Sequence, residues 1–198
     1  MVPALLAARA RLAAARASSS PLPGAEETPC VVRAGGARAT RGRLSVGAIT
    51  VACALGRKGA TRCKREGDGK TVTGAFPVLF GFYRADRMVR PRTRLPMIPL
   101  SRELGWCDEP GHTDYNRPVA LPFAASHECM WRDDGLYDVV LVPDVNVRAP
   151  VSGRGSALFM HVARPGYTPT EGCIALSLRD MRLVLERIGP GDPLVVSV

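Results

Sequence analysis

A histidine and a cysteine near the C-terminus have the types and spacing of a base and a nucleophile. His161 follows an apolar run at residues 157–160, and Cys173 comes 12 positions later, after a loop rich in Pro and Gly. A cysteine is a strong nucleophile only as the thiolate, so it needs a base within hydrogen-bond distance. A loop of this length can fold back and bring the two side chains together. The pair therefore predicts nucleophilic catalysis by Cys173 with His161 as general base.

Either residue alone is more often structural, because a lone cysteine usually behaves as a small core hydrophobe. Their combination with Gly172 strengthens the catalytic interpretation, since a glycine before the nucleophile permits close backbone approach. We also expect a helix to begin shortly after Cys173, and a thiol at such a turn has a lowered pKa.

One helix is predicted after the cysteine. Ser177 can cap it, Asp180 occupies the capping-box position, and apolar residues repeat at helical spacing until Gly189-Pro190. The remaining elements read as short strands broken by turns, at residues 44–51, 76–83, 138–142, 157–160 and 194–198. Residues 84–118 are rich in Arg and Pro and predict a long ordered excursion. The fold class expected is mainly β, with one principal α-helix.

The 198 residues suit a single domain preceded by an arm. Residues 1–30 are expected to be a disordered or targeting segment or an over-extended start, and residues 31–198 the catalytic domain. The arginines at 9, 11 and 16 interrupt the apolar run that a secretory signal requires. No stretch approaches the ~20 apolar residues of a membrane span, so we expect no stable membrane insertion.

The net charge of +9 lies in the first third of the chain. Residues 1–70 hold 13 Lys and Arg against four Asp and Glu, whereas residues 71–198 hold 14 of each. A basic segment can contact nucleic acid or an anionic polymer. This one has no interleaved aromatic residues and no nucleic-acid motif, so we expect no nucleic-acid partner.

The six cysteines are too few and too scattered for a disulfide scaffold; they are Cys30, Cys53, Cys63, Cys107, Cys129 and Cys173. At least one thiol besides Cys173 is expected to stay free. Cys107, His112, His127 and Cys129 lack the compact spacing of a zinc site, so no metal is expected.

Three segments resemble the L,D-transpeptidase (YkuD) family. Residues 155–176 are similar to its catalytic signature, a strand-borne histidine followed by a Ser/Thr-x-Gly-Cys turn, which here is Thr170-Glu171-Gly172-Cys173. Residues 64–77 resemble its early "T-P-x-G-x-F" turn, with Val72 where proline is usual, and residues 105–134 resemble the compact proteobacterial branch. The resemblance covers about residues 44–198 and implies an L,D-transpeptidase-type β-sandwich.

The resemblance also implies an activity and its site. Cys173 would form a thioester with a peptidoglycan stem peptide and pass the acyl group to an amine acceptor, with no cofactor. The Val162 carbonyl would hold the His161 tautomer, and the amides of Glu171, Gly172 and Cys173 would form an oxyanion hole. A monomer in the periplasm is expected, because polymeric peptidoglycan lies outside the cytoplasmic membrane.

Two departures from the family pattern concern substrate binding. Glu171 replaces a usual histidine, and Ala175 replaces a usual arginine thought to neutralise the substrate carboxylate. Arg154 or Arg164 could supply that charge, because a guanidinium can bind a carboxylate with two hydrogen bonds. Further substrate-binding candidates are Thr170, Tyr167 and Trp131.

Two other functions stay open from the sequence. The same Cys–His site could pass the acyl group to water, as a peptidoglycan L,D-carboxypeptidase or endopeptidase. A degenerate site could instead serve a non-catalytic wall-binding module, which Glu171 and Ala175 favour and the intact His161 and Cys173 disfavour.

Overall fold

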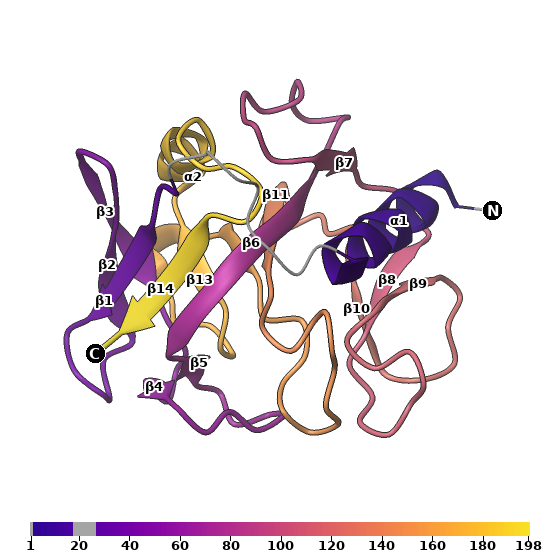
Figure 1. Cartoon of the computed structure of the whole chain (residues 1–198), viewed down its shortest axis with the longest axis horizontal. Coiled ribbons are helices and arrows are strands. Elements are labelled where there is room, and N and C mark those ends of the chain that lie inside the picture. The colour runs from indigo at the N-terminus through magenta and orange to yellow at the C-terminus, as the bar shows by residue number, and fades with distance from the viewer. Residues whose placement is uncertain (1, 18–26) are drawn as a thin grey trace.

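The computed structural model describes residues 2–17 and 27–198, and their fold is mainly β, as expected (Figure 1). Their helices are α1 (Pro3–Ala17), α2 (Leu178–Leu185) and the short 3-10 turn η1 (Pro165–Tyr167). Their strands are β1 (Cys30–Ala34), β2 (Arg41–Val46), β3 (Ile49–Ala54), β4 (Ala60–Thr61), β5 (Thr71–Val72), β6 (Gly74–Tyr83), β7 (Met97–Pro99), β8 (Leu104–Cys107), β9 (Pro118–Ala120), β10 (His127–Cys129), β11 (Val139–Pro143), β12 (Met160–Val162), β13 (Ile174–Leu176) and β14 (Pro193–Ser197).

The principal sheet curves until it closes on itself. Its strand order is β11-β12-β13-β3-β2-β1-β14-β6-β7, and β6 also pairs with β11. The length of β6 makes this possible, because residues 74–77 pair with β14 while residues 78–83 pair with β11. The result is a barrel-like sandwich, and two smaller sheets, β10-β8-β9 and β4-β5, lie beside it.

Two apolar clusters fill the interior. Strand β11 separates them, because Val139 and Leu141 face the first cluster while Val140 and Val142 face the second. A strand that is buried on both faces needs a continuous apolar run, which explains the sequence at this point. The ordered excursion at 84–118 supplies β7, β8 and the fully buried Trp106 to the clusters.

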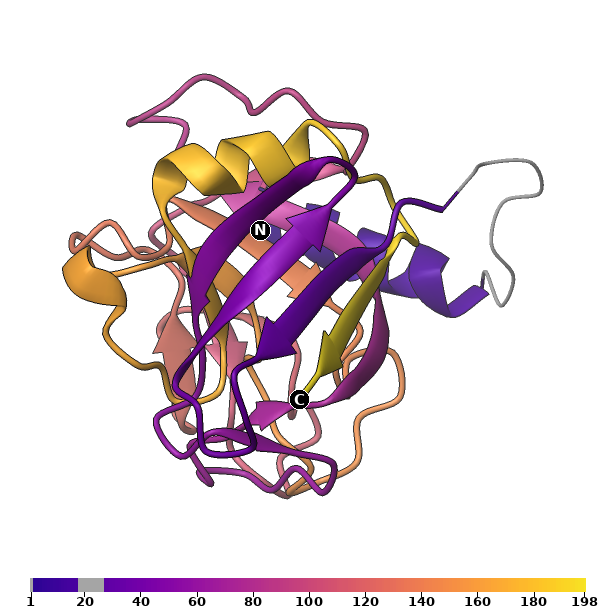
Figure 2. The ribbon, with the colours of Figure 1, turned by 90° about the vertical axis from the view of Figure 1, so that its left-hand side faces the viewer.

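Helix α2 confirms the prediction for the segment after the cysteine. The Ser177 side chain accepts a hydrogen bond from the Asp180 amide at 3.0 Å, as an N-cap should. Met181, Val184 and Leu185 lie on one face and are buried in the first cluster. Each such side chain contributes about 1.5–3 kcal/mol. In Figure 2, α2 lies across one end of β1–β3, whereas α1 lies on the far side of the sheet.

The N-terminal segment differs from the expected disordered arm. Residues 3–17 form α1, because Ala, Leu and Arg are strong helix formers and Pro3 suits a first helical position. Leu5, Ala8 and Leu12 share one face and are buried in the second cluster. The arginines that interrupt the linear sequence lie on other faces, where Arg9 pairs with Asp114 at 3.2 Å. Residues 18–26 lie outside the described residues.

The strand expected at 44–51 is instead a hairpin. Strands β2 and β3 pair in an antiparallel register in which Val46 faces Ile49, and Gly47 begins the turn with a φ of 54°. The alternation of apolar residues continues through this turn, so the sequence pattern does not reveal the break. The strands expected at 76–83, 138–142 and 194–198 correspond to β6, β11 and β14, and the strand expected at 157–160 is shifted to β12, which includes His161.

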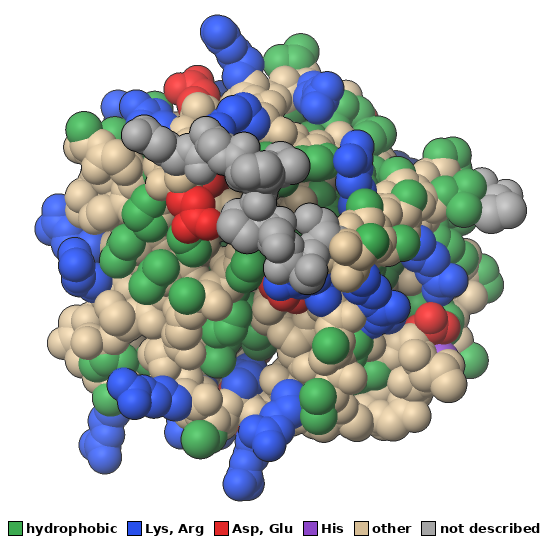
Figure 3. All heavy atoms as spheres, in the orientation of Figure 1, with side chains coloured by type: hydrophobic (Ala, Val, Ile, Leu, Met, Phe, Trp, Pro, Cys, Tyr) green, Lys and Arg blue, Asp and Glu red, His purple; other side chains and the backbone are tan. Residues whose placement is uncertain are grey.

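Basic side chains are spread over the face shown in Figure 3. Its Lys and Arg side chains lie both at the outline and within the face, and they do not gather into one patch. None of the helices in the described parts of the chain has the length and hydropathy needed to span a bilayer.

Candidate active site

The predicted base lies on strand β12, and the predicted nucleophile directly precedes the neighbouring strand β13. β12 and β13 are parallel, and their register places His161 opposite Ala175. Because side chains alternate along a strand, Cys173 lies on the same face as Ala175 and therefore as His161. Cys173, His161 and Ala175 all line one pocket of about 320 Å³. The sheet thus gathers the two residues that the sequence paired.

His161 is held as a neutral imidazole. Its side chain is 7% exposed, and Nδ1 lies 2.9 Å from the carbonyl oxygen of Val162. A carbonyl only accepts hydrogen bonds, so Nδ1 carries the proton and Nε2 is left as the acceptor. Burial lowers the His161 pKa to about 4, against the opposing effect of the Val162 carbonyl. The Tyr137 ring contacts the imidazole edge-on, with 5.4 Å between the centroids of the two rings.

Cys173 is present as a thiol. Its Sγ donates to the Ala157 carbonyl at 3.2 Å and accepts from the Phe159 amide at 3.3 Å. Burial raises the Cys173 pKa to about 12. The expectation of a lowered pKa was wrong, because burial outweighs the hydrogen bond from the Phe159 amide, and strand β13 separates Cys173 from the start of α2. The site therefore rests as a neutral thiol and a neutral imidazole.

The turn at residues 170–173 is stabilised by hydrogen bonds of the Thr170 hydroxyl. Thr170 Oγ1 donates to the Cys173 carbonyl at 2.6 Å and accepts from the Gly172 amide at 3.1 Å. The Gly172 amide was expected to face an oxyanion, but it is directed to Thr170 instead. The amides of Glu171 and Cys173 are the two remaining candidates for that role. Thr170 was expected to bind substrate, and in the structure it both lines the pocket and shapes this turn.

Gly172 is required by its backbone conformation and its neighbours. Its φ of 139° lies in the region that side chains rarely adopt, and a Cβ there would approach the Lys70 carbonyl oxygen to 2.9 Å. The turn is also tied to residues 55–57, because the Thr170 amide donates to the Leu55 carbonyl at 2.9 Å and the Arg57 amide donates to the Thr170 carbonyl at 2.7 Å. The backbone of distant segments thus positions the nucleophile.

Glu171, which replaces the family's second histidine, points to the surface. Its carboxylate pairs with Arg57 Nε at 2.6 Å, and the two side chains are 73% and 49% exposed. Such an exposed pair contributes little to stability. Glu171 still lines the mouth of the pocket.

Another part of the pocket lining carries charges of both signs. It includes Asp108, Glu128, Arg132 and Arg164. Glu128 Oε2 lies 3.7 Å from Arg132 Nη1 and 3.4 Å from the Tyr137 hydroxyl, and burial raises the Glu128 pKa. Arg132 and Arg164 both lie against Asp134, at 2.7 and 3.7 Å. A wall of this kind suits a substrate group with an ammonium and a carboxylate.

Three residues that we expected to bind substrate lie outside this pocket. The guanidinium carbons of Arg84 and Arg102 lie over the Trp131 ring, at 3.7 and 4.8 Å from its centroid. The Tyr167 hydroxyl lies 3.4 Å from an Asp180 oxygen of α2, and Arg154 is exposed. Of the two arginines considered for the substrate carboxylate, Arg164 lines the pocket and Arg154 does not.

Sequence reasoning missed several lining residues, namely Lys64, Glu66, Asp108, Glu128, Arg132, Tyr137 and Ser156. All of them except Ser156, which lies five positions before His161, come from segments remote from the Cys–His motif, and none has a spacing that predicts a chemical role. The available signal was positional, since Lys64 and Glu66 lie in the segment that resembles the family's early turn.

The cysteines and histidines considered for zinc do not form a metal cluster. Within residues 2–17 and 27–198, no group of three or more His, Cys, Asp and Glu side chains is arranged to hold a metal ion. His127 and Cys107 face each other across β10 and β8. All six cysteines are free thiols in this structure.

Comparison with known protein families identifies one match. A family model described as the L,D-transpeptidase catalytic domain, YkuD, matches residues 30–196. No match is found among curated proteins or among solved structures. The matched region begins at β1 and ends in β14, so it includes the whole principal sheet and the pocket.

Proposed function

Since this chain belongs to the YkuD family of L,D-transpeptidase catalytic domains, which act on peptidoglycan, we propose that it cross-links stem peptides through a Cys173 thioester. The observation that carries this proposal is the β12–β13 register, which directs His161 and Cys173 into one pocket. Residues 31–198 are proposed as the catalytic domain, acting as a monomer.

The first half of the reaction would form the acyl-enzyme. The thiol proton, which now points to the Ala157 carbonyl, moves to Nε2 of His161 while Sγ attacks the carbonyl carbon after the L-centre of diaminopimelate. Because both groups are neutral at rest, proton transfer accompanies attack. The tetrahedral intermediate then collapses, the C–N bond to D-Ala breaks, and the imidazolium returns its proton to the leaving amine.

The second half would transfer the acyl group. An amine on a neighbouring stem attacks the thioester and gives a proton to Nε2 of His161. The C–S bond breaks, and Cys173 recovers its proton from the imidazolium. Arg164 and Arg132 are proposed to bind the stem carboxylate, a charge that Ala175 cannot supply, and Glu128 with Asp108 to bind the neighbouring ammonium. In support, the Asp108 Oδ1 atom is buried with no hydrogen-bond partner among the described residues.

The proposed location is the periplasm. The substrate polymer lies outside the cytoplasmic membrane, and the family acts on it. Residues 1–30 remain a proposed targeting segment, although α1 packs on the second cluster in this structure.

Mass spectrometry of muropeptides tests the reaction. Purified full-length protein is incubated with disaccharide tetrapeptide, with Cys173→Ala as the control. We expect a new dimer and released D-Ala. If only shortened monomers form, the enzyme hydrolyses the acyl-enzyme and is a carboxypeptidase or endopeptidase. If neither the disaccharide tetrapeptide nor polymeric peptidoglycan yields a product, a non-catalytic wall-binding module would be favoured.

A further inference from the structure

A lysine that the family resemblance did not single out lies buried beside the nucleophile. The Lys64 side chain is only 6% exposed, although it carries an ammonium group. Lysines are seldom buried to this degree unless they are paired, because removing a charge from water is unfavourable. Lys64 also lines the pocket that contains Cys173 and His161. A buried cation at this position is therefore a candidate functional residue.

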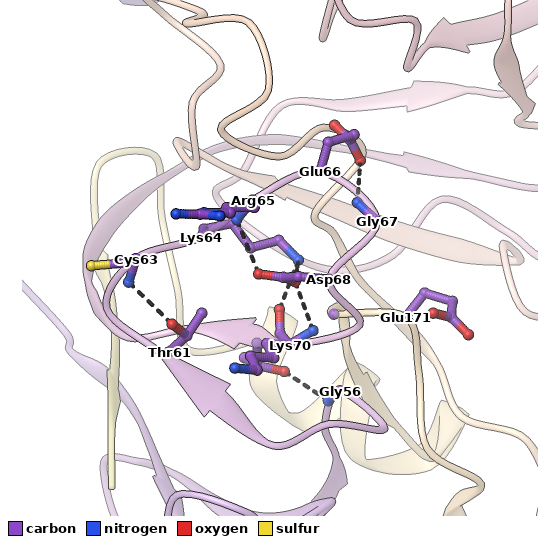
Figure 4. Close-up of polar contacts among 12 residues, drawn as sticks. Gly56, Thr61, Cys63, Lys64, Arg65, Glu66, Gly67, Asp68, Lys70 and Glu171 are labelled. Atoms are coloured by element: carbon purple, nitrogen blue, oxygen red, sulfur yellow. Dashed lines mark hydrogen bonds and ion pairs between the residues drawn. The ribbon is translucent and has the colours of Figure 1, made fainter.

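The loop at residues 64–70 is built around this ammonium group. Lys64 Nζ donates to Asp68 Oδ1 and, at 2.9 Å, to the Lys70 carbonyl. The same Asp68 carboxylate accepts from the amides of Arg65 at 3.0 Å and Lys70 at 2.9 Å. Figure 4 shows these contacts converging inside the loop, with Glu171 of the cysteine turn beside it. The carboxylate fixes the position of the charge.

The Lys64 side chain packs against two glycines, with its stem at Gly155 and its ammonium group at Gly172. A Cβ on Gly155 would lie 2.9 Å from Lys64 Cγ, and a Cβ on Gly172 would lie 3.0 Å from Lys64 Nζ. Both glycines have a positive φ, of 93° and 139°. The ammonium group is therefore packed directly against the residue that precedes the nucleophile, and no side chain intervenes.

The charges around the thiol oppose one another. Burial and the Glu128 carboxylate disfavour the thiolate of Cys173, whereas the Phe159 amide and Lys64 favour it. Among the cations that line the pocket, Lys64 is buried, whereas Arg132 and Arg164 are partly exposed. An ammonium group shielded from water acts on nearby charge more strongly than an exposed one.

We propose that Lys64 is an electrostatic positioning residue, whose buried ammonium stabilises the negative charge that develops on Cys173 during attack. Asp68 holds the ammonium in place and partly offsets its charge. This inference rests on the assignment of Cys173 as nucleophile within the proposed function. It does not depend on whether the acyl acceptor is an amine or water.

Alkylation of Cys173 by iodoacetamide measures the charge effect without any peptidoglycan substrate. The reagent is small and neutral, and its rate follows the thiolate fraction. Cys63 and Cys129 are exposed and will also react, so Cys173 is followed in the tryptic peptide 155–179, which contains no other cysteine. Trypsin leaves this peptide intact because Arg164 precedes Pro165.

Three variants distinguish charge from scaffolding. Lys64→Met removes the charge but keeps most of the stem, and we expect alkylation of Cys173 to slow about tenfold, the equivalent of one pKa unit. Asp68→Asn keeps the shape of its side chain but removes the offsetting charge, and we expect alkylation to quicken about threefold. Arg65→Met removes an exposed cation from the same loop and should change the rate less than about twofold.

The two main variants shift the rate in opposite directions only if the charge acts. A loop that merely braces the cysteine turn would be weakened by both substitutions, so a parallel fall in rate would overturn the proposal, as would no change in Lys64→Met. Circular dichroism verifies folding. If Lys64→Met does not fold, Asp68→Asn decides alone: a faster rate supports the proposal, and an equal or slower rate overturns it. If the charge effect appears while muropeptides are not converted, the proposed function fails and the role of Lys64 stands.

Discussion

The two walls of the pocket are built differently. The cysteine wall is held by backbone hydrogen bonds from residues 55–57, by the Thr170 hydroxyl and by the buried Lys64. The charged part of the lining consists of partly exposed side chains, in which Arg132 is held by Asp134 at 2.7 Å while Arg164 lies 3.7 Å from the same carboxylate. The groups proposed to take part in bond formation are thus fixed mainly by backbone contacts, whereas those proposed for substrate recognition are held by contacts between side chains. Changes to the first wall should therefore affect the rate of reaction, and changes to the second should affect binding.

The largest effect is expected from the nucleophile itself. Cys173→Ala should reduce turnover at least about 1,000-fold, because the thiol and imidazole act as a unit, and His161→Ala should be similar. Cys173→Ser is the matched control, since its hydroxyl can keep the hydrogen bonds to Ala157 and Phe159 but is a poorer nucleophile. Muropeptide conversion is the measurement. Activity of Cys173→Ala above about 1% of wild type would falsify the assignment.

The next largest effect concerns the cysteine turn. Gly172→Ala should lower kcat/KM about 100-fold and destabilise the fold by about 1–3 kcal/mol, because the new Cβ meets the Lys70 carbonyl and φ is positive. Gly166→Ala is the control, since Gly166 has a φ of 74° and open space around it. It should share the conformational strain but change kcat/KM less than about threefold. Equal kinetic effects at both glycines would show that the close contact at Gly172 is unimportant.

Acid should weaken the fold through the buried base. The His161 pKa is about 4 in the folded protein and about 6.5 when unfolded, so between these values the unfolded chain binds more protons. The free energy of unfolding therefore falls as the pH drops from about 6.5 to about 4, by about 3 kcal/mol. His161→Gln lacks this contribution. Urea unfolding of both proteins across this range should show the variant gaining relative stability at low pH, and parallel curves would contradict the buried neutral imidazole.

A smaller effect is expected in the charged part of the lining. Glu128→Gln should raise KM about tenfold with little change in melting temperature and no fall in kcat, because an amide cannot pair with an ammonium as a carboxylate does. Glu109→Gln, at an exposed acid outside the pocket, is the matched control. Steady-state kinetics with tetrapeptide substrate provides the measurement. A fall in kcat with an unchanged KM would instead assign Glu128 to the chemical step.

The smallest effect should come from the residue that departs from the family pattern. Glu171→Gln is expected to change kcat/KM less than about twofold and stability by less than about 1 kcal/mol, because its ion pair with Arg57 is exposed. Arg57→Gln should match it in both measurements. A tenfold loss in Glu171→Gln alone would mean that the carboxylate contacts the substrate.

Local sequence signals predicted those parts of the molecule that depend on neighbouring residues. The capping pattern at Ser177 and Asp180 determined helix α2, and the apolar run at residues 139–142 determined a buried strand. The spacing of His161 and Cys173, together with Gly172, predicted two residues that line one pocket in the structure. In each case the deciding pattern lies within one short segment of the chain, of at most 13 residues from His161 to Cys173.

Only the tertiary structure decided the surroundings of that pair. The Cys173 pKa is raised because distant segments bury the thiol, and the sequence near Cys173 suggested the opposite direction. Lys64, Asp108 and Glu128 reach the pocket from three separate segments, and Arg164 faces it while Arg154 does not. Burial and electrostatic interactions depend on distances between atoms that are far apart in the chain, which local patterns do not encode. For the same reason the arginine-interrupted segment at residues 3–17 acquired a buried face only when the second apolar cluster was present to receive it.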